Sequence, residues 1–113
     1  LPHFRHFLSE IGWEIVREEM IKEDGKFYPM MKAVRRESGE QFAYTEEEAW
    51  FGPLLLRECH PVLKEYLLRE AAIREKILAG LLSAPSESAK ARLAEVKEEM
   101  ELIKSALKRY ESI

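Results

Sequence analysis

The chain has 113 residues and a mass of 13.2 kDa, which leaves room for about one small domain. Its 18 Lys and Arg nearly balance 21 Asp and Glu, and the net charge of -3 excludes a polybasic protein that binds nucleic acid through bulk charge. The single cysteine, Cys59, excludes an internal disulfide framework and fits a reducing compartment such as the cytoplasm.

The ends of the sequence and its apolar runs carry no targeting or membrane signal. No apolar run approaches the roughly 20 residues that span a bilayer, so we expect no membrane association. The start has no basic region followed by an apolar one, as a signal peptide would, and its first residue is Leu1 and not Met. We therefore interpret the chain as a piece of something longer.

The first third of the chain predicts a short helix followed by two antiparallel strands. A first helix suits Pro2 to Ile11, because its apolar residues Phe4, Phe7, Leu8 and Ile11 recur at helical spacing and Gly12 follows. Two runs rich in aromatic and β-branched residues come next, from Trp13 to about Lys22 and from Lys26 to about Val34. Asp24-Gly25 between them is a strong signal for a tight hairpin turn.

Pro29 falls within the second predicted strand. It has no N–H to donate, so we expect it either at a bulge or facing an unpaired edge. The apolar residues of a lone strand pair also need cover, and a two-stranded sheet is marginal in water. The residues concerned are Ile15, Met20, Phe27, Met31 and Val34.

Residues 35–52 are predicted to be mostly connection, with one short helix that Thr45 caps before three glutamates. Gly52-Pro53 interrupts this helix, and an apolar run of three leucines follows.

The last fifty residues predict an antiparallel helical hairpin of coiled-coil type. A heptad seam repeats with spacings of 4 and 3, which requires a partner helix. The helix from about Val62 to Leu82 is the natural partner, because the link between the two is short. Ser83 or Ser86 is the predicted N-cap of the second helix. The seam residues are Ala89, Leu93, Val96, Met100, Ile103, Leu107 and Tyr110.

The first arm of this helical hairpin carries two apolar stripes, with Glu70 and Arg74 between them at a spacing that allows an ion pair. A helix with two stripes usually contacts two things, so the second stripe predicts contact with the mixed segment or with a second copy of the chain. Together these patterns predict an α+β fold in two parts, a mixed segment at 1–52 and a helical hairpin at 53–113.

Most motifs that carry chemistry are absent. The five glycines are too far apart for a phosphate or dinucleotide loop, and neither a nucleophile elbow nor a His-Glu-x-x-His pattern occurs. The histidines His3, His6 and His60 and the thiol of Cys59 do not have the spacing of a structural zinc site. We therefore expect no catalytic, cofactor-binding or metal-binding residue on this chain.

The basic residues allow two interpretations. They can form a solvated face interleaved with acids, or they can contact RNA phosphates. Under the second interpretation the predicted nucleic-acid-binding residues are Arg5, Lys32, Arg35, Arg36, Lys64, Arg69, Lys97 and Lys104. The aromatic residues Trp13, Tyr44, Trp50 and Phe51 are predicted to belong to the core.

Several of these segments, taken in order, resemble a known family. They are Gly12 to Glu19, the turn Glu23 to Tyr28, Tyr44 to Glu48 and, most specifically, Phe51-Gly52-Pro53-Leu54-Leu55-Leu56-Arg57-Glu58. Over nearly the whole chain they look like the C-terminal part of the bacterial tRNA adenine-N1 methyltransferases that modify adenine 22. The helical hairpin is similar to the coiled-coil tail of that family.

The resemblance implies a parent enzyme that transfers a methyl group from S-adenosylmethionine to tRNA. Its class I methyltransferase domain would lie upstream of Leu1 and would hold the cofactor and the catalytic residues. This chain would supply the last two strands of that sheet and a helical tail that assists tRNA binding, and alone it would be inactive. A non-catalytic module for dimerisation or partner binding is the alternative, and self-association is expected of a strand pair separated from its sheet.

Overall fold

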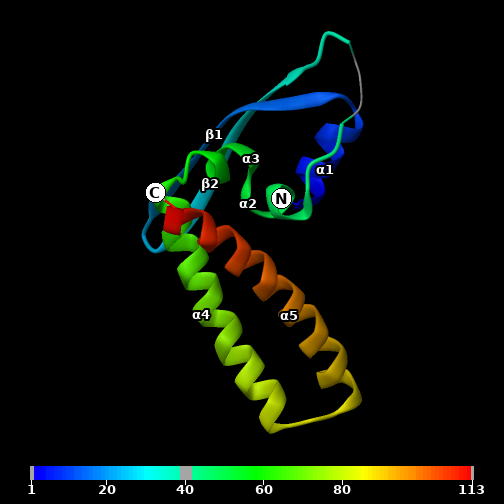
Figure 1. The fold of residues 1–113 in the computed structure, drawn as a ribbon, viewed down its shortest axis with the longest axis vertical. Helices are drawn as coiled ribbons and strands as arrows, with labels where there is room; N and C mark the ends of the chain where they lie inside the picture. Colours follow the sequence, from blue (N-terminus) through cyan, green and yellow to red (C-terminus); the bar gives the residue numbers. More distant parts are fainter. Residues whose placement is uncertain (1, 39–41, 113) are drawn as a thin grey trace. The chain divides into compact units, whose positions relative to one another are not determined.

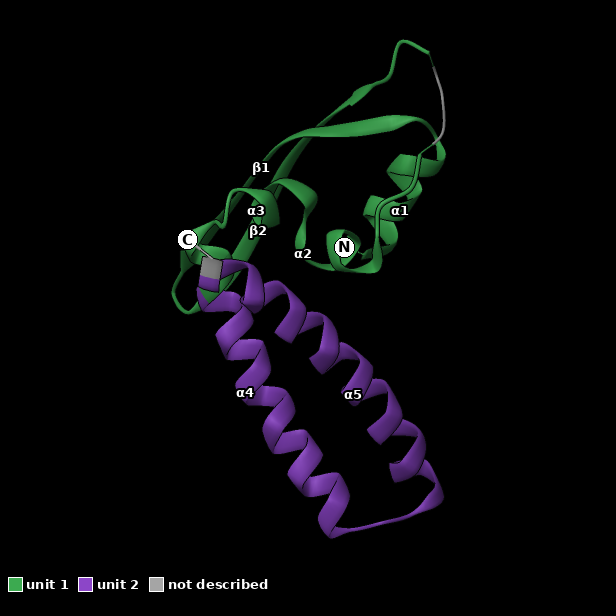
Figure 2. Ribbon diagram, in the orientation of Figure 1, with its two compact units in different colours: residues 1–64 green, residues 65–113 purple. Residues whose placement is uncertain are grey.

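The structure is a computed structural model that describes residues 2–38 and 42–112. The chain forms two compact units, Leu1–Lys64 and Glu65–Ile113 (Figure 2). The first unit holds the strands and the short helices, and the second consists of two long helices (Figure 1). Among the described residues, no helix combines the length and the apolar character that a bilayer crossing requires.

The predicted strand pair is present. Strands β1 (Trp13–Glu23) and β2 (Lys26–Arg35) pair antiparallel around the two-residue turn Asp24-Gly25. Both turn residues have positive φ, 50° and 75°, as a type I′ turn requires. The register is regular from Glu23↔Lys26 to Arg17↔Lys32 and then shifts by one residue at a β-bulge between Ile15 and Arg17.

Pro29 lies opposite Met20 in the regular part of this ladder, away from the bulge. Of the two alternatives predicted for Pro29, the structure therefore favours the unpaired edge. In the described part of the chain the sheet has only these two strands, so one edge of β2 is open.

Three short helices accompany the strands: α1 (Pro2–Glu10), α2 (Glu46–Phe51) and α3 (Pro53–Arg57). The predicted cap of α2 is confirmed, since the Thr45 hydroxyl accepts the Glu48 N–H and the Glu48 carboxylate accepts the Thr45 N–H. Helix α3 begins with Pro53 at its first position and ends with Cys59 in a left-handed conformation (φ 49°). There the N–H groups of Cys59 and His60 donate to the carbonyls of Leu56 and Leu55, which is the Schellman pattern.

The second unit contains most of α4 (Pro61–Ser83), all of α5 (Glu87–Lys108) and the short 3-10 helix η1 (Arg109–Ser112). Ser86 caps α5 by accepting the Ala89 N–H, which settles the choice left open between Ser83 and Ser86. The predicted seam is the buried side of α5: Ala89, Val96, Met100, Ile103 and Tyr110 are buried, and Leu93 and Leu107 are half-buried.

Glu70 and Arg74 on α4 form the predicted ion pair, at 3.0 Å. Arg74 also donates to Glu99 on α5 at 3.2 Å, so this pair is part of the contact between the two helices. Of the large apolar residues on α4, Leu68, Ile73 and Leu82 remain exposed.

Two features differ from the sequence prediction. The predicted apolar stripe of the first helix is only partly buried: Leu8 is buried together with Arg5 and Ser9, whereas Phe4, Phe7 and Ile11 are about half exposed. In addition, the first unit extends past the predicted boundary at residue 52, because α3 packs on β1 and shares the first unit's polar core.

Candidate nucleic-acid interface

A buried carboxylate organises the first unit. The side chain of Glu18 on β1 accepts hydrogen bonds from the backbone N–H groups of Leu54 (2.8 Å) and Leu55 (3.3 Å) at the start of α3. A carboxylate is favoured there, because the first N–H groups of a helix have no partner within the helix and carry partial positive charge.

Arg5 of α1 completes this cluster. Its Nη2 lies 3.1 Å from Glu18 Oε2, and its Nη1 donates to the Ala49 carbonyl at 2.8 Å. Only 1% of Arg5 is exposed. The prediction that Arg5 contacts nucleic acid is therefore wrong. Burying an unpaired guanidinium is very costly, so this side chain is held by Glu18 and by the Ala49 carbonyl in the last turn of α2.

The backbone conformation and the close contact with Glu18 require a glycine at position 52, between Phe51 and Pro53. The φ of Gly52 is +95°, and a Cβ atom built there would lie 2.6 Å from one carboxylate oxygen of Glu18. A side chain at this position would displace the carboxylate from the start of α3. Pro53 follows at the first helical position, where its missing N–H costs nothing.

The β-bulge at Val16 decides which way the charged residues of β1 point. In a regular strand Ile15 and Arg17 would share one face and Glu18 would lie on the other. The extra residue reverses this alternation, so Glu18 is buried on the same side as Ile15 and Met20, and Arg17 is exposed directly opposite Lys32. Sequence reasoning missed both Glu18 and Arg17.

The three basic residues predicted along β2 do not form one cluster. Lys32 and Arg35 are exposed but three residues apart on a strand, so they lie on opposite faces. Arg36 is half-buried, and its guanidinium lies over the Phe42 ring at 4.6 Å. The Lys32 side chain is therefore exposed to solvent, whereas the Arg36 guanidinium is partly covered by the Phe42 ring.

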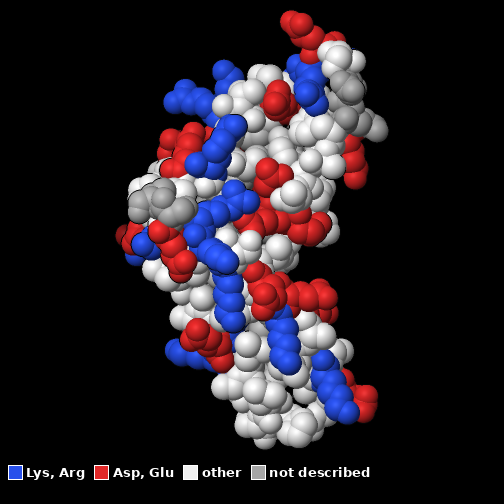
Figure 3. Space-filling view, in the orientation of Figure 1, with Lys and Arg blue, Asp and Glu red and all other residues white. Residues whose placement is uncertain are grey.

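The basic residues of the two long helices fall into two groups. Lys97 and Lys104 are exposed on α5 and seven residues apart, which places them on one face about 10 Å apart along the axis. Lys64 and Arg69, also exposed, are five residues apart on α4 and so point about 140° apart around it. Figure 3 shows Lys and Arg side chains in a run down the middle of this face, with Asp and Glu side chains grouped beside them.

The remaining polar residues have structural roles. The Tyr44 hydroxyl accepts the Ile15 N–H at 3.1 Å, and burial is the main cause that raises the pKa of this phenol, with the charges of Glu14, Glu18 and Glu48 adding to it. His6 and His60 pair with Glu46 and Glu19, each at 3.0 Å. Within residues 2–38 and 42–112, no three His, Cys, Asp or Glu residues are grouped as metal ligands.

The predicted core aromatics are divided. Phe51 is buried, Tyr44 and Trp50 are half-buried, and Trp13 is 38% exposed. Trp13 lies at the open end of the strand pair, where no other described element covers it fully.

These observations define an α+β protein of two units: a buried Arg–Glu cluster stabilises the first, two long helices form the second, and exposed cations lie on both. Residues 2–105 match the family model described as tRNA (adenine(22)-N(1))-methyltransferase. The chain belongs to this family. No curated protein matches it significantly.

Solved structures agree with this assignment. An uncharacterised protein from Listeria monocytogenes serotype 4b is 26% identical with a TM-score of 0.87 over 94% of this chain and 46% of its own. The Bacillus subtilis M1A22 tRNA methyltransferase TrmK is 25% identical, with a TM-score of 0.77 over 94% and 47% of the two chains. Sp1610 of Streptococcus pneumoniae, a putative tRNA (m1A22) methyltransferase, is 27% identical, with a TM-score of 0.74 over 94% of this chain and 44% of its own. The chain thus spans less than half the length of these relatives.

Proposed function

We propose that this chain is the C-terminal region of an enzyme that transfers a methyl group from S-adenosylmethionine to N1 of adenine 22 in tRNA. The observation that carries the proposal is the family match over residues 2–105, with similar structures over 94% of the chain. One of these relatives is named as an M1A22 tRNA methyltransferase, and Sp1610 was crystallised in complex with S-adenosyl-L-methionine. The enzyme would act in the cytoplasm, as the presence of a single cysteine also suggests.

In this proposal the 113 residues hold neither the cofactor nor the catalytic groups. The chain spans 42–47% of the length of the matched structures. Its buried charged side chains Arg5 and Glu18 bind other parts of the first unit and so stabilise the fold. The cofactor site and the reacting groups would belong to polypeptide outside these residues. Alone, the chain would bind tRNA without methylating it.

The activity is tested by comparing the chain alone with the same chain joined to the methyltransferase domain of a family member. We expect the joined protein to transfer labelled methyl groups to a tRNA transcript, and the chain alone to transfer none. A transcript with guanine at position 22 is the matched control. Methylation by the chain alone, or equal methylation of both transcripts, would contradict the proposal.

We further propose that α5 contributes phosphate contacts through Lys97 and Lys104. Both are exposed, both lie on one helix face, and neither forms an ion pair with a described residue. Lysines at this spacing can reach separate phosphates without reading the base sequence.

The test is the double variant Lys97→Gln, Lys104→Gln. Because each lost phosphate contact lowers the salt slope of log K by about 0.7 to 0.9, we expect the slope to fall by about 1.4 to 1.8. Lys76→Gln on α4 removes an exposed lysine outside the proposed set and should leave the slope unchanged. If both variants changed the salt slope equally, Lys97 and Lys104 would contribute only general positive charge, and the proposed phosphate contacts would be wrong.

Self-association is a second candidate function, and a specific observation favours it. Phe4, Phe7 and Ile11 form a half-exposed apolar stripe on α1, and Leu82 near the end of α4 is 65% exposed. Apolar residues at helical spacing on one face are typical of a surface that a partner covers. We propose a second copy of the chain as that partner.

A further inference from the structure

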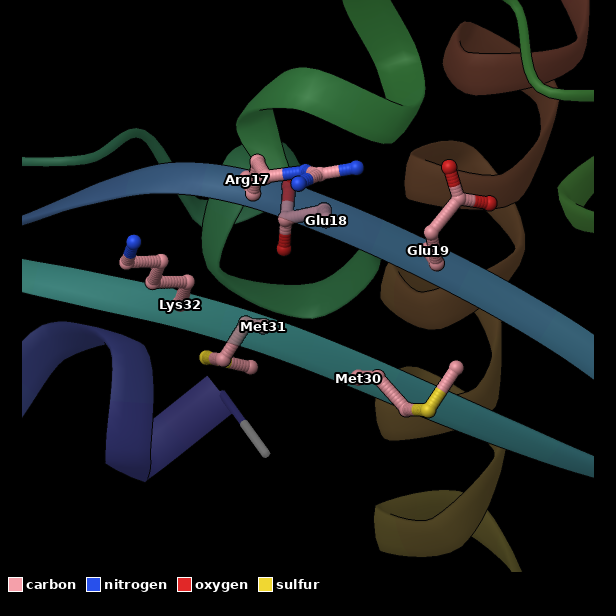
Figure 4. Close-up of a pocket in the computed structure, with 6 residues that line it drawn as sticks. All are labelled: Arg17, Glu18, Glu19, Met30, Met31 and Lys32. Carbon is pink, nitrogen blue, oxygen red and sulfur yellow. The ribbon is translucent and has the colours of Figure 1, made fainter.

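We infer that Arg17 and Lys32 form a phosphate-binding pair for RNA on the outer face of the strand pair. This inference rests on the proposed tRNA-binding function and adds to it a second site, in the first unit. Arg17 comes from β1 and Lys32 from β2, and the register pairs the two residues across the ladder, while in Figure 4 their side chains extend in opposite directions.

The first argument is electrostatic. Like charges directly opposite in an antiparallel pair lie about 5 Å apart at their Cβ atoms and destabilise the sheet. In the described part of the chain, neither side chain takes part in an ion pair or a hydrogen bond, and both are exposed. A bound phosphate would remove the repulsion, since a guanidinium and an ammonium would share one anion.

The second argument is the bulge. Without the extra residue, Val16 would lie opposite Lys32 and Arg17 would point to the buried side. Bulges re-aim side chains and are common next to functional sites. Here one irregularity both turns Glu18 inward to Arg5 and turns Arg17 outward to Lys32.

The third argument is the surface around the pair. Arg17, Lys32, Met30, Met31, Glu18 and Glu19 line a shallow hollow of about 230 Å³. Glu18 pairs with Arg5, and Glu19 hydrogen-bonds with His60 at 3.0 Å, so the hollow presents two cations beside one exposed carboxylate whose acceptor capacity is partly used. Met30 is 49% exposed and offers a thioether surface on which the adjoining nucleoside can pack.

The chemistry therefore points to a phosphodiester with its nucleoside. The forked guanidinium of Arg17 suits two phosphate oxygens, and Lys32 adds a flexible charge from the other strand. Such a site would position RNA without reading its sequence.

The experiment measures binding of a tRNA transcript to the 113-residue chain as salt is varied. The variants are Arg17→Gln and Lys32→Gln, and we expect each to weaken binding about five- to tenfold at 0.1 M salt and to lower the salt slope by about 0.7 to 0.9. Lys26→Gln is the matched control, because Lys26 lies on the same face but opposite Glu23. Its loss should leave the affinity nearly unchanged.

A second readout separates binding from folding. Removing either cation relieves the cross-strand repulsion, so Arg17→Gln and Lys32→Gln should raise the melting temperature by about 2 °C while they weaken binding. A lower melting temperature together with weaker binding would assign these residues a structural role and overturn the inference.

The arm variant Lys97→Gln, Lys104→Gln is measured in the same titration. If the arm variant loses affinity while Arg17→Gln and Lys32→Gln behave like Lys26→Gln, the strand site fails and the proposed function stands. If the unmodified chain does not bind tRNA, the proposed function of this region fails as well. Competition by inorganic phosphate at millimolar concentration, equal to that by a short RNA, would show that the pair binds free phosphate and not the RNA backbone.

Discussion

At the scale of single residues, Glu18 has the largest number of distinct roles. It neutralises Arg5, accepts the first free N–H groups of α3 and lies against Gly52, so it joins α1, β1 and α3 through one carboxylate. Buried charges are tolerated when they are paired and hydrogen-bonded, and no buried side-chain polar atom in the described residues lacks a partner.

Three glycines allow a matched test of this cluster. Gly52→Ala should lower the free energy of unfolding by more than about 2 kcal/mol, since it combines a positive φ with a Cβ 2.6 Å from Glu18. Gly25→Ala keeps only the strain of φ +75° and should cost about 1 kcal/mol. Gly80→Ala, in a helix with free space around it, should stabilise by about 0.5 to 1 kcal/mol. Urea denaturation measures all three, and equal effects at positions 52 and 25 would disprove the role given to the carboxylate.

At the scale of elements, turn and cap residues determine where several of the helices and strands begin and end. The Asp-Gly turn and the Thr45 cap occur where the sequence places them, and the cap of α5 is Ser86, one of the two serines that the sequence offers. Each acts within a few residues, so tertiary contacts have little opportunity to override it.

The two serines of the link between α4 and α5 test this. Ser86→Ala removes the acceptor of the Ala89 N–H and should cost about 1 kcal/mol, whereas Ser83→Ala removes only a bond to the Gly80 carbonyl at an exposed helix end and should cost a few tenths. Thermal unfolding followed by circular dichroism compares the two variants. A larger loss for Ser83→Ala would overturn the assignment of the cap.

At the scale of the whole molecule, apolar surface remains exposed on α1, on the outer face of the strands and at the end of α4. For a chain of this size, such area favours association at high concentration.

We therefore predict that light scattering gives a mass above 13.2 kDa that rises with protein concentration. Phe7→Glu, in the α1 stripe, should shift the mass toward the monomer because it places a charge within the covered area. Leu68→Lys is the matched control, because Leu68 is a half-exposed leucine on α4 outside the proposed surface, and it should have the smaller effect. A monomer at every concentration would exclude self-association.

The sequence by itself determined the strand pair, the first helix, the Thr45-capped helix and the two long helices, together with the α+β class and the family, but not the short helix α3 or the 3-10 helix η1. Turns, caps and heptad spacing are short-range patterns, and the segment from Phe51 to Glu58 is specific enough to identify relatives. It also contained an unused signal: Ile15 and Met20 both need cover, yet an odd spacing cannot place two residues on one face of a regular strand. This spacing indicates an irregularity between the two residues but does not give its position, which decides where Arg17 and Glu18 point.

Only the tertiary structure decided which charges are available. Arg5 resembles any other basic residue in the sequence, but the fold brings it to Glu18, thirteen residues away, and to the Ala49 carbonyl. The bulge that turns Glu18 inward also turns Arg17 outward to Lys32. Burial and pairing depend on groups that are distant in the chain, so the direction in which a charged side chain points follows from packing and not from local pattern.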